Sequence, residues 1–323
     1  MEALSAESAA DLATHRRIRK SPQLALISLH MLIALRVLAQ FPQPPTPHRH
    51  ASSDLCSMPG LAENAGRKLK PEDLLDSYNA QAALIHSLEA SAIVRVQSSS
   101  RHAAKLRDSR PAPVEIRFLA PAWLRMTGVV PFSARRTFDM WSDGRDFRML
   151  MPEGDVMKFF VGSVNAPPTS SNPRENLRPQ MVLEALHWSL AKLAASPGSA
   201  SNKGAGSQTI EVELTGPALG DRGRAEVEFD TRSGTVSRVE MLDEASKVVT
   251  DIDYNDWHEV PNSLDGETSV CFPKRVLVSD RQQDLQVEMK ILSTEMNPQL
   301  SPGQLQLIPP RGIPVTRIPA HPQ

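Results

Sequence analysis

The sequence is poor in cysteine, which limits the kinds of site it can build. Cys56 and Cys271 are the only two cysteines among 323 residues. Two isolated cysteines form neither a zinc signature nor a CxxC redox motif. A single bridge between them is one interpretation, and two unrelated thiols is the interpretation that we prefer.

A strong charge of either sign is also missing. The formal net charge is −1, and 40% of the residues are hydrophobic. A disordered chain has fewer apolar residues and a larger net charge, and a nucleic-acid-binding domain carries a strongly basic face. We therefore expect a folded protein that has no nucleic-acid partner.

The common catalytic motifs are absent. The sequence contains no GxSxG, GxxxxGK[ST], HExxH or GxGxxG, which are the signatures of nucleophile elbows, phosphate loops, zinc proteases and dinucleotide sites. Glu226 and Glu228 alternate along one predicted strand without an acid–base partner nearby, and His187 and Trp188 are single residues on a predicted helix. We expect no catalytic residues, no enzymatic activity and no cofactor.

The most polar cluster is "DIDYNDWHEV", residues Asp251 to Val260. Its first residues match the early positions of a calcium-binding EF-hand loop, but Asp256 stands where that loop requires glycine and Asn262 stands where it requires glutamate. The same residues alternate polar and apolar as a half-exposed strand does. We favour the strand and expect no metal site.

No hydrophobic run is long enough for a comfortable membrane span. The longest, "LALISLHMLIAL" (Leu24–Leu35), follows the basic "THRRIRK" and precedes "VLA", which has small residues at a signal-cleavage spacing. We expect residues 1–39 to be a signal peptide or, as the second choice, a signal anchor. Residues 40–69 are rich in Pro and Ser and predict a linker. Cys56 within it lacks a lipobox, so its lipidation stays open.

Two stretches show helical periodicity. Apolar residues from Leu74 to Leu88 recur at steps of three and four within "KPEDLLDSYNAQAALIHSLEA" (Lys70–Ala90). The second helix is predicted over Pro179–Ala195, with its apolar stripe running from Val182 to Leu193. The small-residue stretch Ser196–Gln208 that follows it predicts a flexible loop.

Twelve further segments read as strands separated by short turns. They are Ser91–Gln97, Pro113–Ala120, Trp123–Val130, Arg135–Trp141, Asp146–Met151, Asp155–Gly162, Thr209–Leu214, Arg224–Asp230, Thr235–Leu242, Lys247–Trp257, Ser269–Ser279 and Gln282–Met296. Short turns, among them the Asp-Gly of "SDGR", favour antiparallel meanders. The pattern predicts a mainly β protein with helices (α+β), in which about 11–12 strands close or curl around the helices.

One stretch, "WLRMTGVVPFSARRTFDMWSDGRDFRMLMP" (Trp123–Pro152), carries large apolar side chains on both faces of its strands. Phe138 and Met140 share one parity, whereas Trp141 and Leu150 take the other. One face must pack on a core, and the other needs a second apolar partner.

Two segments resemble the LolA/LolB-like lipoprotein-localisation superfamily. They are "VEIRFLAPAWLRMTGVVPFSARRTFDMWSDGRDFRMLMPEGDVMKFFVG" and the region from "VVTDIDYNDWHEV" through "CFPKRVLVSDRQQDLQVEMKILSTEMNPQLSPGQLQLIPPRG". The resemblance covers residues 70–316, leaving 317–323 as a tail. It implies a half-open antiparallel β-barrel that is lidded by helices and has an apolar concave side. Its best-known members carry or receive lipoprotein acyl chains across the periplasm.

The resemblance leads to a functional hypothesis. We expect a non-enzymatic, exported protein in the periplasm or on the periplasmic face of the outer membrane, which binds a lipid acyl chain or lipoprotein. The alternative is a structural or interaction module of an envelope assembly with a filled barrel interior and a protein partner. Flexible Met side chains suit a surface that adapts to varied apolar ligands. The candidate cavity residues are Trp123, Met126, Phe138, Met140, Phe147, Met149, Met151 and Phe160.

Overall fold

The computed structural model describes residue 56 and residues 69–98, 110–129, 136–153, 156–166, 178–186, 188–194, 200–204, 206–215 and 223–319. The chain divides into two compact units, residues 1–53 and 54–323, and all described residues belong to the second. The predicted signal segment 1–39 and all of the linker 40–69 except Cys56 and Leu69 lie outside the described residues.

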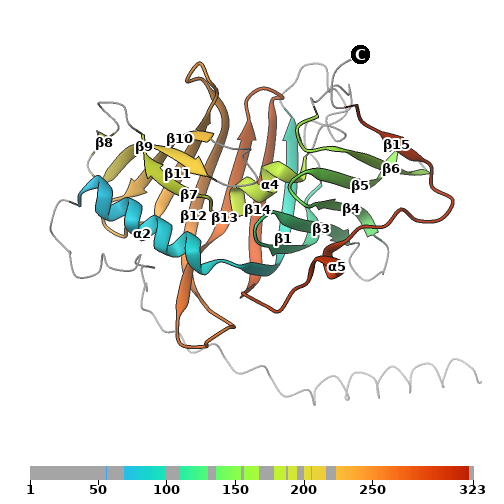
Figure 1. Ribbon diagram of the computed structural model, residues 1–323, viewed down its shortest axis with the longest axis horizontal. Coiled ribbons are helices and arrows are strands. Elements are labelled where there is room, and N and C mark those ends of the chain that lie inside the picture. The colour runs from blue at the N-terminus through green and yellow to red at the C-terminus, as the bar shows by residue number, and fades with distance from the viewer. Residues whose placement is uncertain are drawn as a thin grey trace, which may run out of the picture. The chain divides into compact units, whose positions relative to one another are not determined.

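Fifteen strands form a single sheet in the described part of the chain (Figure 1). The strands are β1 (Ser87–Ser98), β2 (Ala112–Leu119), β3 (Trp123–Val129), β4 (Arg136–Ser142), β5 (Asp146–Glu153), β6 (Val156–Ser163), β7 (Leu190–Leu193), β8 (Ala200–Gly204), β9 (Ser207–Thr215), β10 (Gly223–Asp230), β11 (Val236–Leu242), β12 (Val248–Pro261), β13 (Ser269–Asp280), β14 (Leu285–Met296) and β15 (Val315–Arg317).

The sheet is two antiparallel meanders joined side by side. Its order is β15-β6-β5-β4-β3-β2-β1-β14-β13-β12-β11-β10-β9-β7, and β8 also pairs with β9. The long strands β1 and β14 join the meanders at the centre, and β15 pairs with β6 in parallel. No pairing among these strands closes the path, so the sheet is open. The mainly β fold with helices and an unclosed antiparallel sheet confirms the fold class predicted from the sequence.

The Asp-Gly turn forms as predicted between β4 and β5. Asp143 Oδ1 accepts hydrogen bonds from the backbone N–H groups of Arg145 and Asp146, each at 2.9 Å. Gly144 has φ +88°, and a Cβ there would lie 2.5 Å from that of Ala122. Only glycine meets both requirements without strain.

All twelve predicted strands are present, and three short strands were missed: β7, β8 and β15. β7 and β8 pair with β9, whose backbone groups they satisfy at that edge. The prediction of helix as far as Ala195 was therefore wrong over the described residues 188–194, and the prediction of a loop was wrong over 200–204 and 207–208. β12 is a strand, as we favoured over a calcium loop, and its Asp251 pairs with Arg238 and Arg281.

Three helices occur in the described residues: α2 (Pro71–Leu84), α4 (Pro179–Leu186) and α5 (Pro302–Leu305). The first helix ends six residues earlier than predicted, because Asn297 caps it. The Asn297 amide donates to Leu84 O at 2.8 Å, and its Oδ1 accepts the N–H groups of His86 and Ser87. Leu88, predicted on the helical stripe, therefore lies on β1.

Helices α2 and α4 lie over one face of the sheet, which we call the inner face (Figure 1). α2 contacts β7 and β13, and α4 contacts β3, β4 and β13. The main hydrophobic core lies between these helices and the sheet and includes buried residues of both meanders. The opposite face is the outer face.

We call the C-terminal segment, residues 298–319, the strap. Its part up to Ile313 covers the outer face of β3–β6, and β15 within it pairs with β6 at the edge of the sheet. Trp141, Leu150 and Phe159 form a second apolar cluster there with Leu305 and Leu307 of the strap. Thus α5 and its neighbours supply the second apolar partner that the two-faced stretch Trp123–Pro152 required.

Two arginines hold the strap in place. Arg125 donates to Gln306 O at 3.1 Å and makes a two-bond ion pair with buried Asp139. Arg148 donates to Leu307 O at 2.8 Å, and its guanidinium lies 4.7 Å from the centre of a Trp141 ring. Such pre-oriented donors fix the strap backbone over the apolar cluster.

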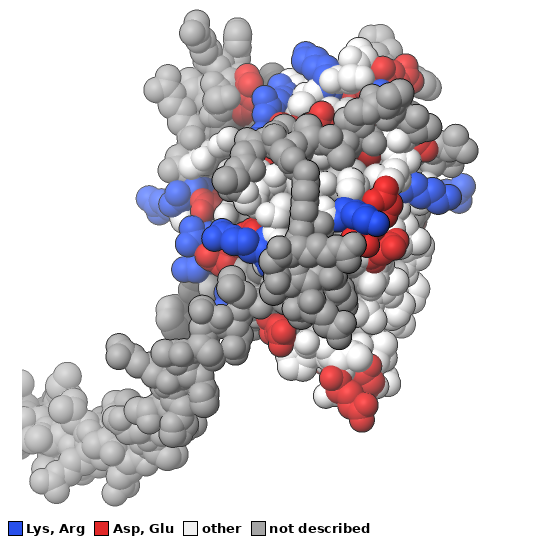
Figure 2. All heavy atoms as spheres, turned by 90° about the vertical axis from the view of Figure 1, so that its left-hand side faces the viewer, with Lys and Arg blue, Asp and Glu red and all other residues white. Residues whose placement is uncertain are grey.

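Charges of both signs are interspersed over the side of the molecule that Figure 2 views. This agrees with the near-zero net charge of the whole chain. Interspersed charges of both signs partly cancel and do not build up a strong field of one sign.

Candidate functional site

An aromatic cluster lies between the helices and the second meander. It contains both tyrosines of the chain, Tyr78 and Tyr254, and two of its four tryptophans, Trp188 and Trp257. The Tyr78 and Trp188 rings are stacked with centroids 5.6 Å apart, and Trp188 meets Trp257 edge to face at 5.2 Å. Such pairs favour these offset and T-shaped geometries. Both tyrosines and half of the tryptophans of the chain therefore lie together in this cluster.

Helix α2 and the segment after α4 bring Tyr78 and Trp188 together. Asn79, next to Tyr78, makes two hydrogen bonds to the backbone of Ala191, one from its Nδ2 to the carbonyl and one to its Oδ1 from the N–H, each at 2.8 Å. The side chain thus pairs with β7 as a neighbouring strand would. This anchors Trp188, two residues before β7, against the helix.

Trp257 joins the cluster from β12, directly after a residue with a left-handed backbone conformation. Residues three apart on a regular strand face opposite sides. Asp256 has φ +57°, a left-handed conformation that aspartate tolerates better than most residues. The pairing of β12 with β13 keeps one register through this point, and the Tyr254 and Trp257 rings lie with centroids 5.9 Å apart.

A small cavity of about 20 Å³ opens at this cluster. A cavity of this size holds one water molecule or a group of similar size. Its lining consists of Tyr78, Glu184, Trp188, Ser189, Leu214, Val236, Val239, Met241, Ile252 and Tyr254. The site is therefore apolar and aromatic with one carboxyl group.

Glu184 carries the one carboxyl group in the lining of this cavity. Burial raises the pKa of Glu184 from its usual 4.5 to about 8, and the negative charge of Asp280 adds to the shift. Burial also raises the pKa of Tyr78 and that of Tyr254, so both hydroxyls stay protonated. At neutral pH the cavity thus presents hydroxyl groups and a largely protonated carboxyl.

The eight residues predicted to line a cavity do not all lie on the same face of the sheet. Met126, Met140 and Phe147 are at most 1% exposed in the main core, where Phe138 packs at its border. Met149, Met151 and Phe160 lie in the same core, all on the inner face. Trp123 lies on the outer face, where its ring meets that of Trp141 at 5.7 Å. Seven of the eight residues thus share a face, and Trp123 does not join them.

Phe147 also borders an open groove of about 960 Å³ between the strap and the edge of the sheet. Arg148 and Arg317 line the groove together with Ile318. Gly162 allows this approach, since a Cβ there would lie 2.9 Å from the Phe147 ring and 3.1 Å from Ile318. The groove is larger and more open than the aromatic cavity.

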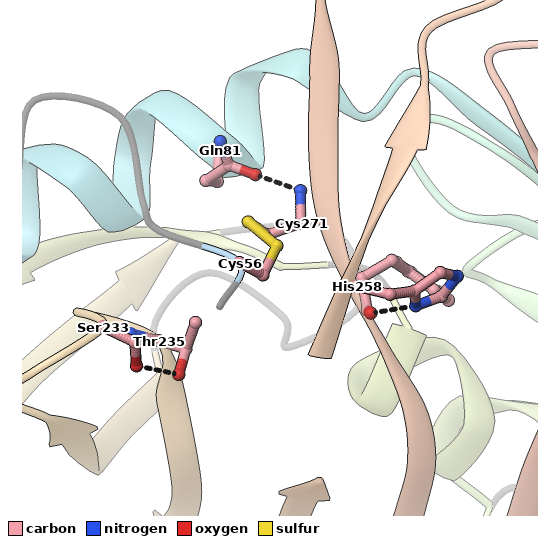
Figure 3. Close-up of a disulfide and its surroundings, with 7 residues drawn as sticks. Cys56, Gln81, Ser233, Thr235, His258 and Cys271 are labelled. Atoms are coloured by element: carbon pink, nitrogen blue, oxygen red, sulfur yellow. Dashed lines mark hydrogen bonds between the residues drawn. A yellow bond between two sulfur atoms is a disulfide. The ribbon is translucent and has the colours of Figure 1, made fainter. Parts of the chain in front are cut away.

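A disulfide joins Cys56 to Cys271, so the preference for two unrelated thiols was wrong (Figure 3). The bridge connects the segment that precedes α2 to β13, and Gln81 of α2 accepts the Cys271 N–H at 3.0 Å. Both sulfurs are buried. The bridge leaves Cys56 no thiol for lipidation, a question that the sequence had left open.

Reasoning from the sequence did not predict the aromatic cluster. Trp188 was taken as a single residue on a helix, and Tyr254 and Trp257 as parts of an ordinary strand. One available signal was the scarcity of tyrosine, since both copies lie on elements that face the core. Their meeting depends on contacts between residues of different elements that are far apart in the sequence, which no local pattern reports.

Among the described residues, no helix is both long enough and apolar enough to cross a membrane.

No family model matches the chain, and no curated protein matches it. The chain is similar to several solved structures, three of which follow. A LolA superfamily protein from Nitrosomonas europaea is 11% identical, with a TM-score of 0.45 over 72% of this chain and 97% of that one. A putative outer membrane lipoprotein-sorting protein domain from Vibrio parahaemolyticus is 10% identical, with a TM-score of 0.45 over 72% and 94%.

The third is a DUF1329 family protein from Desulfovibrio piger, which is 12% identical with a TM-score of 0.44 over 72% of this chain and 95% of that one. The first of the three belongs to the superfamily that the sequence resembles. Similarity at this level assigns neither a ligand nor a partner to the chain.

Proposed function

We propose that this chain is a non-enzymatic envelope protein that binds a lipid acyl chain, free or on a lipoprotein, on its inner face beneath α2 and α4. The observation that carries the proposal is the aromatic cavity between Tyr78, Trp188 and Tyr254. Aromatic and aliphatic walls with few polar groups are typical of sites for apolar ligands. The sequence resemblance to lipoprotein-localisation proteins supports the same class of ligand.

The cavity holds one water-sized group, so a longer ligand requires the helices to move. α4 has only eight residues and packs through Met181, Val182, Leu183 and their neighbours on the inner face. Met126 and Met140 lie on β3 and β4, the strands that α4 contacts, and unbranched Met side chains repack at low cost. In this proposal the seven inner-face candidates line the site once α4 is displaced.

The disulfide supports an extracytoplasmic location. Structural disulfides form and persist in oxidising compartments and are rare where thiols are kept reduced. Cys56–Cys271 is buried and joins distant parts of the chain, as a structural bridge does. Together with the predicted signal segment at 1–39, it favours export to the periplasm or to the periplasmic face of the outer membrane.

The alternative is an interaction module whose interior is filled by its own side chains. It is favoured by the near-complete burial of Met126, Met140 and Phe147 and by the small volume of the cavity. Such a module would act on an envelope partner through its surface. The two functions differ in whether the inner face accepts an added apolar molecule.

A fluorescent apolar probe, 1-N-phenylnaphthylamine, discriminates between the two. Val239→Ala enlarges the cavity and is expected to tighten probe binding, because apolar cavities bind apolar guests. Val260→Ala removes the same atoms from a buried position that does not line the cavity, so it controls for lost stability. Probe binding that is tighter in Val239→Ala alone supports a ligand site. No binding by the wild type or either variant supports the filled interior.

A further inference from the structure

The aromatic cavity contains one feature that an acyl chain does not use, the carboxyl group of Glu184. An acyl-binding site needs only apolar walls, and a buried acid costs free energy unless something pairs with it. Glu184 lies in the cavity lining, and the loss of solvent around it raises the pKa of its carboxyl group. Glu184 is the one Asp or Glu side chain in the lining of this cavity.

The surroundings of Glu184 suit a cation. Tyr78, Trp188 and Tyr254 line the same cavity. The faces of Tyr and Trp rings attract ammonium groups, and the attraction strengthens in a desolvated site. Two phenol hydroxyls add acceptor oxygens. An anion is disfavoured, because Asp280 already places negative charge near Glu184.

The size of the cavity selects among cations. About 20 Å³ accommodates one group the size of water, which a primary ammonium matches and a trimethylammonium exceeds. The oxygen-bearing side chains of the lining, Glu184, Tyr78, Tyr254 and Ser189, offer acceptors for the three N–H donors of the ammonium. The apolar remainder of the ligand would then continue along the inner face.

We propose that the cavity between Tyr78, Glu184, Trp188 and Tyr254 binds the primary ammonium group of an amphiphile, with the Glu184 carboxylate as its counter-ion. This deepens the proposed function and depends on it, because the acyl chain of the same ligand occupies the inner face. An aminoalkyl lipid headgroup and the amino terminus of an acylated peptide share this chemistry.

The pH dependence of binding follows from the groups that face Glu184: Tyr78 on α2, Tyr254 on β12 and Asp280 at the end of β13. The Glu184 carboxyl has a pKa of about 8 and must lose its proton to pair with the cation. The tyrosines stay neutral over this range, since burial raises the pKa of each. Affinity for an alkylammonium therefore rises as the pH approaches 8.

Isothermal titration calorimetry with decylammonium and decanol, both below their micelle-forming concentrations, tests the proposal on the disulfide-bonded protein. At pH 8 the wild type is expected to bind decylammonium about tenfold or more tightly than decanol, as a charge-assisted contact provides. Glu184→Gln, which keeps the shape, is expected to bind the two equally. Glu259→Gln removes an exposed carboxylate from β12 and should behave as the wild type.

The relative affinities for decylammonium and decanol distinguish the ammonium site from the proposed function. Equal binding of decylammonium and decanol by the wild type overturns the ammonium site and leaves the proposed function standing. Binding of neither compound overturns both. Decyltrimethylammonium should lack the tenfold gain, and an equal gain would contradict the assignment to this water-sized cavity. Decanol binding to Glu184→Gln shows that the variant is folded and that its loss is specific to the cation.

Discussion

The rings of Tyr78 and Trp188 lie parallel, within 8° of each other and with centroids 5.6 Å apart. One ring belongs to α2 and the other to the segment that follows α4, so this pair joins the two helical covers of the inner face. Tyr254 and Trp257 continue the contact onto β12. Displacing the helices therefore separates aromatic rings, and the cluster is both the closing contact and the lining of the proposed site.

Replacing Trp188 by leucine removes this contact. We expect the free energy of unfolding to fall by about 2–4 kcal/mol, since Trp188 is 4% exposed and truncation of a buried aromatic leaves a cavity. Tyr254→Phe keeps its ring and should change stability by less than about 1.5 kcal/mol. Urea denaturation followed by circular dichroism measures both. Equal losses would show that ring contacts do not hold the helices.

Glu184 predicts a pH-dependent stability. Its pKa is about 8 in the folded protein and near 4.5 when exposed, so the folded state holds the proton more tightly. This contribution is full below pH 4.5 and is lost as the pH rises to about 8. Glu184→Gln should be less sensitive to pH over that range, whereas exposed Glu259→Gln should retain the wild-type slope. Identical slopes in all three proteins would contradict the raised pKa.

The disulfide is expected to stabilise the fold by about 2–5 kcal/mol. Cys56→Ser and Cys271→Ser should lose the same amount, and the double variant no more, since either change breaks the one bridge. Ellman's reagent added to wild-type protein unfolded without a reductant should find no free thiol. Two reactive thiols would show that the disulfide is absent and that the two cysteines are unpaired, as we preferred from the sequence.

We expect substitutions at two residues of the strap to differ in their effect on stability. Leu305 is fully buried on the outer face, so Leu305→Ala should cost about 2–4 kcal/mol and shift tryptophan emission to the red as Trp141 meets water. Ile308 is 70% exposed, and Ile308→Ala should change stability by less than about 0.5 kcal/mol. A similar effect of both changes would mean that the strap does not cover the outer face in solution.

Alternation and turn chemistry were sufficient to predict the twelve strands of the two meanders. The Asp-Gly turn at Asp143–Gly144 and the shared face of Phe138 and Met140 depend on residues that are close in the sequence. Features of this kind can be predicted from the sequence. The missed strands are short and are defined by their neighbours. Leu190–Leu193 has helical spacing, yet it pairs with β9 because Asn79 and the open edge offer better partners to its backbone.

The site was harder to predict than the fold. The sequence identified the two-faced stretch correctly, but both partners that explain it are distant: α4 for Met126 and Met140, and the strap for Trp141. The aromatic cluster joins Tyr78 to Tyr254, and the disulfide spans 215 residues. Such contacts depend on topology, which spacing along the chain does not encode.

The four tryptophans provide the most direct test, because two lie at the proposed site and two lie under the strap. A brominated decanol quenches tryptophans that it touches. One variant, Trp123→Phe with Trp141→Phe, keeps only the site pair, and the other, Trp188→Phe with Trp257→Phe, keeps only the outer pair. If the ligand binds on the inner face, tryptophan fluorescence is quenched saturably in the first variant and is not quenched in the second. Quenching of the outer pair alone, or of neither, would contradict ligand binding on the inner face.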